Sequence, residues 1–339
     1  MAKRKFNDRM SKIEPAVMTI TLATPNTTAG STSNNYFDLS QIASLLNRRF
    51  YRQGLNWAVA GFKFSSLQTG TINVAKLPNT WVMSNAWEKS FRSWQRMNDA
   101  ALAESESVRP RFLDYKIYAD HTHAVAGYGA NLRPVDALGN LAVLGEWTPS
   151  KFIIPDNNNA GFSTEREAIA VGASFQGAGA SGLNSVSLIE GYASSRGLPN
   201  IADPNTPDDA ADAGGATPEN WMAALFNEGT SQDDSVLEDM ITENNIAPYP
   251  FENDGTNVDT MYPGGANNLP GLQWHDLVQI YPTSVTTNVG IVHGKGGNFP
   301  CGLVRVDWTP SEVSANLVIQ VDLVPGNHRG YLAEPMTEM

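Results

Sequence analysis

Four short motifs contain residue types that perform chemistry in other proteins. They are Gly177–Gly182, which fits GxGxxG, His293–Gly297, which has part of a phosphate-loop pattern, the pair His121 and His123, and the single cysteine, Cys301. A GxGxxG turn binds a dinucleotide only where a helix follows, because the helix N-terminus holds the pyrophosphate. The residues after Gly182 alternate as in a strand, so we expect a flexible loop or hairpin. In the second motif Val289 stands where a Walker loop needs glycine, and neither Ser nor Thr follows Lys295.

His121 and His123 come at the end of a segment that reads as a strand, directly after Asp120. Side chains two residues apart in a strand share a face, so the two histidines could hold a metal while Asp120 points away. No third ligand is identifiable, and surface histidines are the simpler interpretation. The acidic loop Glu252–Gly255 lacks the spacing of a calcium loop. We therefore expect no cofactor. Structural calcium at a subunit contact stays open. Cys301 has no base beside it and reads as a small buried hydrophobe, so we do not expect an enzyme.

The charged residues are divided unequally along the chain. Residues 1–133 contain 17 Lys and Arg against 9 Asp and Glu, whereas residues 134–339 contain 6 against 26. The most acidic stretch, Gly197–His275, has 14 Asp and Glu and neither Lys nor Arg. Such an uneven field indicates a polyanion or an acidic neighbour on one side and water on the other. Acidic loops that only keep the protein in solution are an equally good interpretation.

Most of the chain reads with a period of two and is rich in β-branched and aromatic residues, which predicts strands. We expect about eleven: Ala16–Ala23, Trp57–Ser65, Thr71–Lys76, Arg111–Asp120, Lys151–Ile154, Glu167–Phe175, Ser185–Tyr192, Leu272–Tyr281, Gly290–His293, Gly302–Trp308 and Leu317–Val324. In the last, Leu317, Ile319, Val321 and Leu323 form one wholly apolar face that must lie on a core. Short strands separated by long loops predict an all-β fold, a β-sandwich of antiparallel sheets.

Two short helices are expected between the strands. The first begins at Asp38, which caps the helix while Gln41 reaches back as the capping-box partner, and Gly54 lies beyond its end. It ends in Arg48, Arg49 and Arg52, cations that suit a helix C-terminus. The second, about Ala86–Ala103, has an aromatic face and a basic face. The two faces consist of Trp87, Phe91, Trp94 and Ala101, and of Lys89, Arg92 and Arg96. A solvated polar face is the simpler interpretation of these cations, and phosphate contact the weaker one.

Composition suggests where the chain divides. We expect a short basic N-terminal arm at residues 1–15 and one domain at residues 16–339, with an acidic loop insertion at about 197–271 that is rich in Pro, Gly and Asp. Basic residues of the arm can neutralise phosphates without reading sequence. No stretch approaches the roughly 20 apolar residues of a membrane span, and no apolar region follows the basic N-terminus. We therefore expect neither a signal peptide nor membrane insertion.

Five blocks spread over nearly the whole chain connect it to a known family. They are Tyr36–Gln41 with Asn47–Trp57, Lys76–Trp87, Arg109–Phe112, Gly296–Gly302 and Val324–Leu332. These blocks resemble the capsid proteins of small circular single-stranded DNA viruses that encode a replication initiator, the CRESS-DNA virus group. The resemblance implies a jelly roll, a shell domain that self-assembles into an icosahedral homo-oligomer, a location in the virion, and a single-stranded DNA genome bound without sequence specificity. Related capsids commonly carry a long Arg-rich arm, whereas this chain has five basic residues in its first twelve.

Because the arm is short, charge neutralisation has to rely on further arginines and lysines at the inner wall or on counter-ions. The nucleic-acid-binding residues that we expect are Lys3, Arg4, Lys5, Arg9, Lys12, Arg48, Arg49, Arg52, Lys89, Arg92 and Arg96. The 8 Trp and 10 Tyr are available for the core and for contacts between copies. The alternative is a carbohydrate-binding or host-attachment β-sandwich module, which exposed Trp or Tyr on loops would favour. A hydrolase that uses His121 or His123 is the weakest hypothesis, and the sequence leaves the host receptor unidentified.

Overall fold

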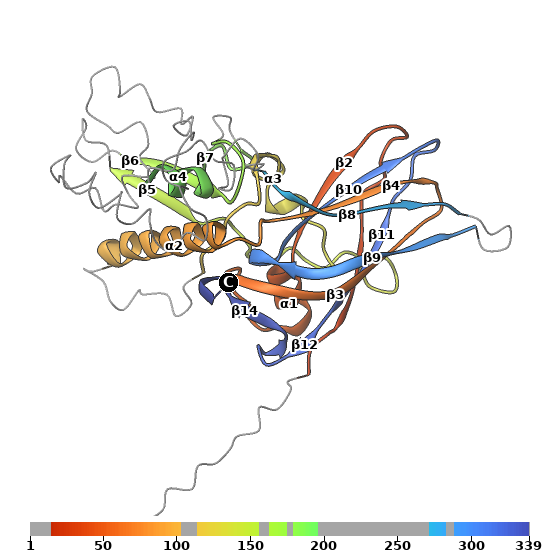
Figure 1. Cartoon of the computed structure of the whole chain (residues 1–339), viewed down its shortest axis with the longest axis horizontal. Helices are drawn as coiled ribbons and strands as arrows, with labels where there is room; N and C mark the ends of the chain where they lie inside the picture. Colours follow the sequence, from red (N-terminus) through yellow and green to blue (C-terminus); the bar gives the residue numbers. More distant parts are fainter. Residues whose placement is uncertain are drawn as a thin grey trace, which may run out of the picture.

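The protein consists mainly of β-strands arranged in two antiparallel sheets that share one core (Figure 1). The computed structural model describes residues 15–102, 114–155, 163–174, 179–195, 271–282 and 288–338. In the first sheet β11 (Val318–Leu323) lies between β1 (Thr19–Ala23) and β3 (Leu55–Ser66), β9 (Gly290–Phe299) pairs with the other edge of β3, and β14 (Ala333–Pro335) pairs with the start of β3. The second sheet has the order β2 (Ser33–Asp38), β10 (Leu303–Pro310), β4 (Gly70–Lys76) and β8 (Gln273–Ile280).

Alternating apolar residues build the core between the two sheets, as the sequence pattern predicts. Ile319 and Val321 of β11 are completely buried together with Val306 and Trp308 of β10. Each large apolar side chain buried in this way stabilises the fold by about 1.5–3 kcal/mol. Buried indoles also need a hydrogen-bond acceptor, and the Trp308 Nε1 donates to the Ala315 carbonyl at 3.0 Å.

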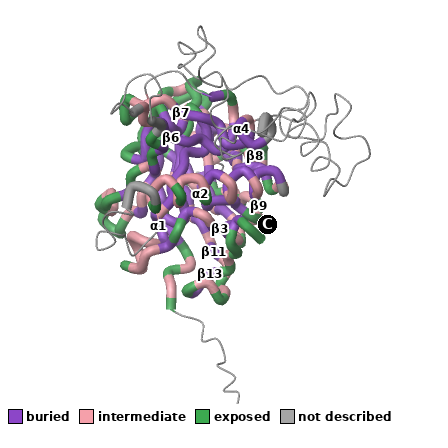
Figure 2. Tube along the Cα trace, turned by 90° about the vertical axis from the view of Figure 1, so that its left-hand side faces the viewer, coloured by how far each residue is buried: buried purple, intermediate pink, exposed green. Residues whose placement is uncertain are grey.

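The connection between β4 and β8 contains most of the other elements. It includes α2 (Trp81–Leu102), α3 (His121–Ala126), a 3-10 turn (Tyr128–Ala130), the three-stranded sheet β5 (Lys151–Pro155), β6 (Ser163–Ile169) and β7 (Asn184–Ser187), and α4 (Leu188–Ser195). A second apolar cluster, with Met83, Phe152 and Tyr192 among its members, holds α2 and α4 on this small sheet. Figure 2 shows buried residues in β6 and β7 as well as in the large sheets. These elements gather at one end of the two large sheets (Figure 1).

The short segments of the fold complete the other connections. Between β2 and β3 lies α1 (Leu39–Asn47), and between β9 and β10 lies a 3-10 turn (Pro300–Gly302). The chain ends with the ribbon of β12 (Pro325–Gly326) and β13 (Gly330–Tyr331), then β14 and a 3-10 turn (Met336–Glu338). Cys301 lies in the Pro300–Gly302 turn and is completely buried, which confirms its interpretation as a buried apolar residue.

Several strand predictions are confirmed within a few residues, and others are wrong. The described part of Arg111–Asp120 forms only a single bridge at Tyr118, and β6 ends at Ile169 rather than Phe175. The segment predicted as a strand at Ser185–Tyr192 turns into α4 after Ser187, whose hydroxyl accepts the Glu190 N–H at 3.4 Å. Ser187 and Glu190 are spaced as a capping box, a signal that the alternation hid. The sequence also gave no sign of β2.

The predicted helices are also corrected. The described residues contain four helices, not two short ones, and α2 has 22 residues. It begins five residues before Ala86, because the Thr80 hydroxyl accepts the Met83 N–H at 3.4 Å at the helix start. Asp38 caps α1 as predicted, but Gln41 does not reach back: its Oε1 accepts from Asn131 instead. The helix ends at Asn47 with Arg48 as a left-handed C-cap, well before Gly54. The basic arm up to residue 14 and the acidic insertion from Gly197 to residue 270 lie outside the described residues.

Candidate nucleic-acid interface

The loop between α1 and β3, residues 48–54, presents arginines on a rigid base. Arg48 and Arg52 are exposed, whereas Tyr51 and Gln53 are buried. The Tyr51 N–H donates to the Ser44 hydroxyl at 2.9 Å, and the Ser40 hydroxyl donates to the Arg52 carbonyl at 3.0 Å. The Gln53 amide bonds to the Asp38 carboxylate, the Tyr128 hydroxyl, and the N–H and C=O of Ile117. Because buried hydrogen bonds fix the backbone, the cations have a defined position before any ligand arrives.

The turn that joins β12 and β13 adds another arginine to this surface. Arg329 is exposed and has a left-handed backbone with φ of 50°. Its guanidinium donates to the Phe50 carbonyl at 2.6 Å, and the Tyr51 hydroxyl donates to the Arg329 carbonyl at 3.0 Å. Two segments almost 280 residues apart in sequence are thus bonded to each other. We call Arg48, Arg49, Arg52 and Arg329 the arginine cluster.

The N-terminal part of the described chain lies beside the arginine cluster. The Val17 N–H donates to the Asn47 Oδ1 at 3.0 Å, and the Tyr331 hydroxyl donates to the Val17 carbonyl at 2.8 Å. Burial raises the pKa of Tyr331, and the positive charge of Arg49 opposes this rise. The chain therefore enters the fold at Pro15 close to these arginines. The predicted phosphate-binding residues Lys3, Arg4, Lys5, Arg9 and Lys12 precede Pro15 and lie outside the described residues.

A pocket of about 490 Å³ opens between this loop and α2. Its lining combines aromatic side chains with cations and, among the residues that the structure describes, contains no acidic residue. The lining residues are Phe50, Arg52, Gly54, Leu55, Trp87, Phe91, Tyr115, His328, Arg329, Pro335 and Thr337. Trp87 and Phe91 are stacked, with ring centroids 5.1 Å apart. Aromatic rings next to guanidinium groups are what proteins use to bind single-stranded nucleic acid, because bases stack on the rings and phosphates pair with the cations.

One polar atom of a residue that lines this pocket has no hydrogen-bond partner in the described part of the chain. Trp87 is only 6% exposed, and its Nε1 is buried without a hydrogen-bond acceptor among the described residues. A buried donor of this kind costs about 1–3 kcal/mol when it stays unpaired. An acceptor on a bound ligand, such as a carbonyl oxygen of a base, would satisfy it. Burial and the neighbouring Arg329 lower the pKa of His328, so this lining residue is neutral near pH 7.

The structure does not bring the predicted cations of α2 into this site. Trp87, Phe91 and Trp94 pack on the second core as predicted, and the basic residues occupy the opposite side of the helix. The Lys89 ammonium lies over the Tyr192 ring of α4, 5.4 Å from its centroid. Arg92 is 68% exposed and pairs with Glu88 one turn earlier, and Arg96 lies on the same side of the helix. These three residues therefore form a separate basic surface from the arginine cluster.

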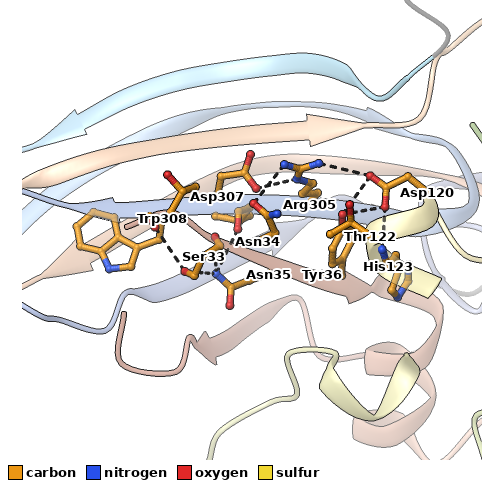
Figure 3. Close-up of polar contacts among 12 residues, drawn as sticks. Ser33, Asn34, Asn35, Tyr36, Asp120, Thr122, His123, Arg305, Asp307 and Trp308 are labelled. Atoms are coloured by element: carbon orange, nitrogen blue, oxygen red, sulfur yellow. Dashed lines mark hydrogen bonds and ion pairs between the residues drawn. The ribbon is translucent and has the colours of Figure 1, made fainter. Parts of the chain in front are cut away.

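The two histidines do not have the geometry expected from a strand. Both lie on α3, where positions two apart point in very different directions, and His123 is completely buried while His121 is exposed. Asp120 caps this helix by accepting the His123 N–H at 2.9 Å instead of pointing away (Figure 3). Both ring nitrogens of His123 have partners, the Ala119 N–H at 3.1 Å and the Asn131 Oδ1 at 2.9 Å. A shared metal between these two side chains is therefore excluded by their placement.

The other motifs are placed in ordinary backbone. His293–Gly297 forms part of strand β9, so it is not a phosphate loop. Of Gly177–Gly182 the described residues begin at Gly179, and the chain enters β7, not a helix, directly after it. Within the described ranges no group of three or more His, Cys, Asp or Glu could hold a metal, and no helix is long and apolar enough to span a membrane. Glu252–Gly255 lies outside the described residues.

Sequence reasoning missed three residues of the pocket: Phe50, His328 and Arg329. Each lies within one of two sequence blocks, Asn47–Trp57 and Val324–Leu332, but no local pattern shows that the two blocks meet. No family model matches the chain, and no match was found among curated proteins or solved structures. Function is therefore inferred from the geometry of the site and from the order of the strands.

Proposed function

We propose that this protein is a structural coat protein whose copies assemble into a closed shell around single-stranded DNA, and that its domain is a jelly roll. The observation that supports this most directly is nested strand pairing. Among the eight main strands, β1 pairs with β11, β2 with β10, β3 with β9 and β4 with β8, all antiparallel. This is the pairing of one long hairpin rolled into two four-stranded sheets. Jelly rolls of this kind form viral capsids and lectins.

The end of the sheets away from α2 has the character of a contact surface. Three connections there expose large apolar side chains: Leu67 is 55% exposed, Tyr281 57% and Val313 53%. The connections are neighbours, since the Ser311 N–H donates to the Thr69 carbonyl at 2.9 Å and Gly70 pairs with Ile280. Exposed apolar groups gathered in this way mark an interaction site more often than a free surface. We infer that this end meets the same end of other copies.

The arginine cluster supports a polyanion as the content of the shell. It lies where the described chain begins and beside an aromatic pocket whose described lining has no acidic residue. Phosphate pairing and base stacking need no particular sequence, which suits the packaging of a whole genome. The protein's place would then be the virion.

Assembly is tested by electron microscopy and light scattering on the purified full chain. We expect uniform closed particles, and we expect Leu67→Asp with Val313→Asp to leave a folded but unassembled protein. Ile153→Asp is the matched control, because Ile153 is 50% exposed in the small sheet formed by β5, β6 and β7. A monodisperse monomer under all assembly conditions would contradict the shell, and assembly by the double variant would contradict the proposed contact.

Nucleic-acid contact is tested separately with Arg48, Arg49 and Arg52 changed together to Gln. Each lost phosphate contact reduces the slope of log affinity against log salt by about 0.7 for single strands, so three contacts reduce it by about 2. The control changes Lys89, Arg92 and Arg96 to Gln, which removes the same charge from the separate surface on α2. Equal salt dependence in the first variant and the wild type would remove the arginine cluster from the site.

A further inference from the structure

A second hollow lies on the outward face of the sheet β2-β10-β4-β8 and belongs neither to the arginine cluster nor to the apolar end. It has a volume of about 350 Å³. Strand register places Arg305, Ala75 and Trp274 side by side across β10, β4 and β8, with Asp307 beside Asn73 in the next row. The small Ala75 between two large side chains makes the floor of the hollow. Asp120, Gly172, Ala173 and Leu272 contribute to its walls.

A β-bulge places Trp274 over this hollow. The register of β4 and β8 shifts between Val74 and Ala75, which pair with Asp276 and Trp274, so His275 is the extra residue. Without the bulge, Trp274 would point to the same side as Asp276, away from the hollow. Instead its indole is 66% exposed. Bulges commonly re-aim a side chain beside a binding site.

The opposite side of the hollow is polar and held rigidly. The Arg305 guanidinium donates to Asp307 at 2.7 Å, to Asn34 at 3.2 Å and to Asp120 at 3.4 Å, and it lies 5.9 Å from the centre of the Tyr36 ring (Figure 3). Asp120 is itself fixed by the Tyr36 hydroxyl at 2.8 Å. The Asn73 Oδ1, by contrast, is buried without a hydrogen-bond partner among the described residues. The lining thus provides fixed donors and acceptors and one acceptor that still needs a donor.

From these residues we infer that the hollow binds a neutral saccharide, with one pyranose ring stacked on Trp274 and its hydroxyl groups bonded to Asn73 and Asp307. A sugar ring has an apolar C–H face that fits an exposed indole and hydroxyl groups around its edge that donate to amide and carboxylate oxygens. The volume suits one or two such rings.

Charge decides against the anionic ligands that could also stack on an indole. Among the described lining residues, Asp120 and Asp307 face the guanidinium of Arg305, which both of them already neutralise, and His121 is the other titratable side chain. A phosphate, sulfate or sialic-acid carboxylate would meet an excess of negative charge here. A nucleotide is therefore disfavoured, in contrast to the pocket beside the arginine cluster.

The test is a glycan array followed by titration calorimetry with the best neutral glycan, using the full chain. Trp274→Ala should weaken binding by about tenfold or more, as expected for removal of a central aromatic anchor. Asn73→Leu should also weaken it. Ile153→Ala is the control, because Ile153 is an exposed apolar residue that lies outside both the hollow and the apolar end of the sheets. We expect this variant to bind as the wild type does.

Three outcomes would overturn the inference: no neutral glycan binds, Trp274→Ala binds as tightly as the wild type, or only sulfated and sialylated glycans bind. Circular dichroism shows whether a weak variant is still folded. Electron microscopy of the same samples reports on shell formation independently, because none of the residues changed here belongs to the apolar end of the sheets or to the arginine cluster. Failure of glycan binding and failure of assembly are therefore distinguishable.

Discussion

Acid should destabilise this protein through His123, whose ring is held in its neutral form. The Nδ1 accepts the Ala119 N–H at 3.1 Å, so the ring proton is on Nε2 and is donated to Asn131 at 2.9 Å. The Tyr36 ring stacks on the imidazole with centroids 4.5 Å apart. A second proton would have to be added at Nδ1, directly opposite an N–H donor. Burial lowers the pKa of His123 from 6.5 to about 4, although Asn131 and the charge of Asp120 oppose this shift.

The sign and the size of the effect follow from the two pKa values. Between pH 6.5 and about 4 the unfolded chain binds a proton at His123 that the folded protein does not. Stability from this group is therefore present above pH 6.5 and is lost as the pH falls, by up to about 1.4 kcal/mol for each pH unit. From pH 7 to pH 4.5 the loss amounts to about 2.4 kcal/mol. That is a large fraction of the free energy of unfolding of an ordinary domain.

Asp38 acts in the opposite direction, so the assay needs a comparison between variants. Burial raises the pKa of Asp38 from 3.8 to about 6, despite four hydrogen bonds that lower it, so the folded protein binds the extra proton in that range. Both the wild type and His123→Gln contain Asp38. Comparing the urea unfolding of these two proteins at pH 7 and pH 4.5 therefore cancels the contribution of Asp38. We expect the wild type to lose about 2.4 kcal/mol more than the variant does. Parallel losses in the two proteins would refute the assignment to His123.

Two further predictions concern the parts that support the arginine cluster. Asp38→Ala removes the cap of α1 and an acceptor of the buried Gln53 amide. In urea titrations we expect the free energy of unfolding to fall by about 3 kcal/mol. A loss below about 1 kcal/mol would contradict the role of the cap. Gly54→Ala would place a methyl group 2.1 Å from the Trp87 indole. We expect a cost of about 1–3 kcal/mol and a changed near-ultraviolet circular dichroism spectrum as the indole moves, whereas a spectrum identical to the wild type would mean that the loop adapts without moving the indole.

The strongest sequence predictions concerned residues whose environment is set by near neighbours. The alternation in Leu317–Val324 predicted β11 because one face of a strand must meet a core. Asp38 was recognisable as a cap because its carboxylate bonds to backbone groups two and three residues away. The interpretation of Ser185–Tyr192 as a strand failed because a short apolar run fits both periods, and the capping spacing of Ser187 and Glu190 within it was overlooked.

The candidate sites depended on contacts that no local pattern describes. Arg329 reaches Phe50 only because the chain returns through the nested strand pairs to the start of β3. Trp274 faces outward only because of a bulge that is defined by its pairing with β4. The sequence suggested the same phosphate-binding role for Lys89 and Arg52. In the structure Lys89 lies over the Tyr192 ring of α4, whereas Arg52 lines the pocket beside the arginine cluster.

The sequence by itself determined the dominant β-structure, the cap of α1, the aromatic face of α2 and the burial of Cys301, because each of these follows from side chains within one or two turns of the backbone. Only the tertiary structure decided which cations share a surface, which tryptophan is exposed and which histidine is kept neutral. Those properties arise from desolvation and from contacts between distant segments, and their energies exist only once the sheets have closed around a common core.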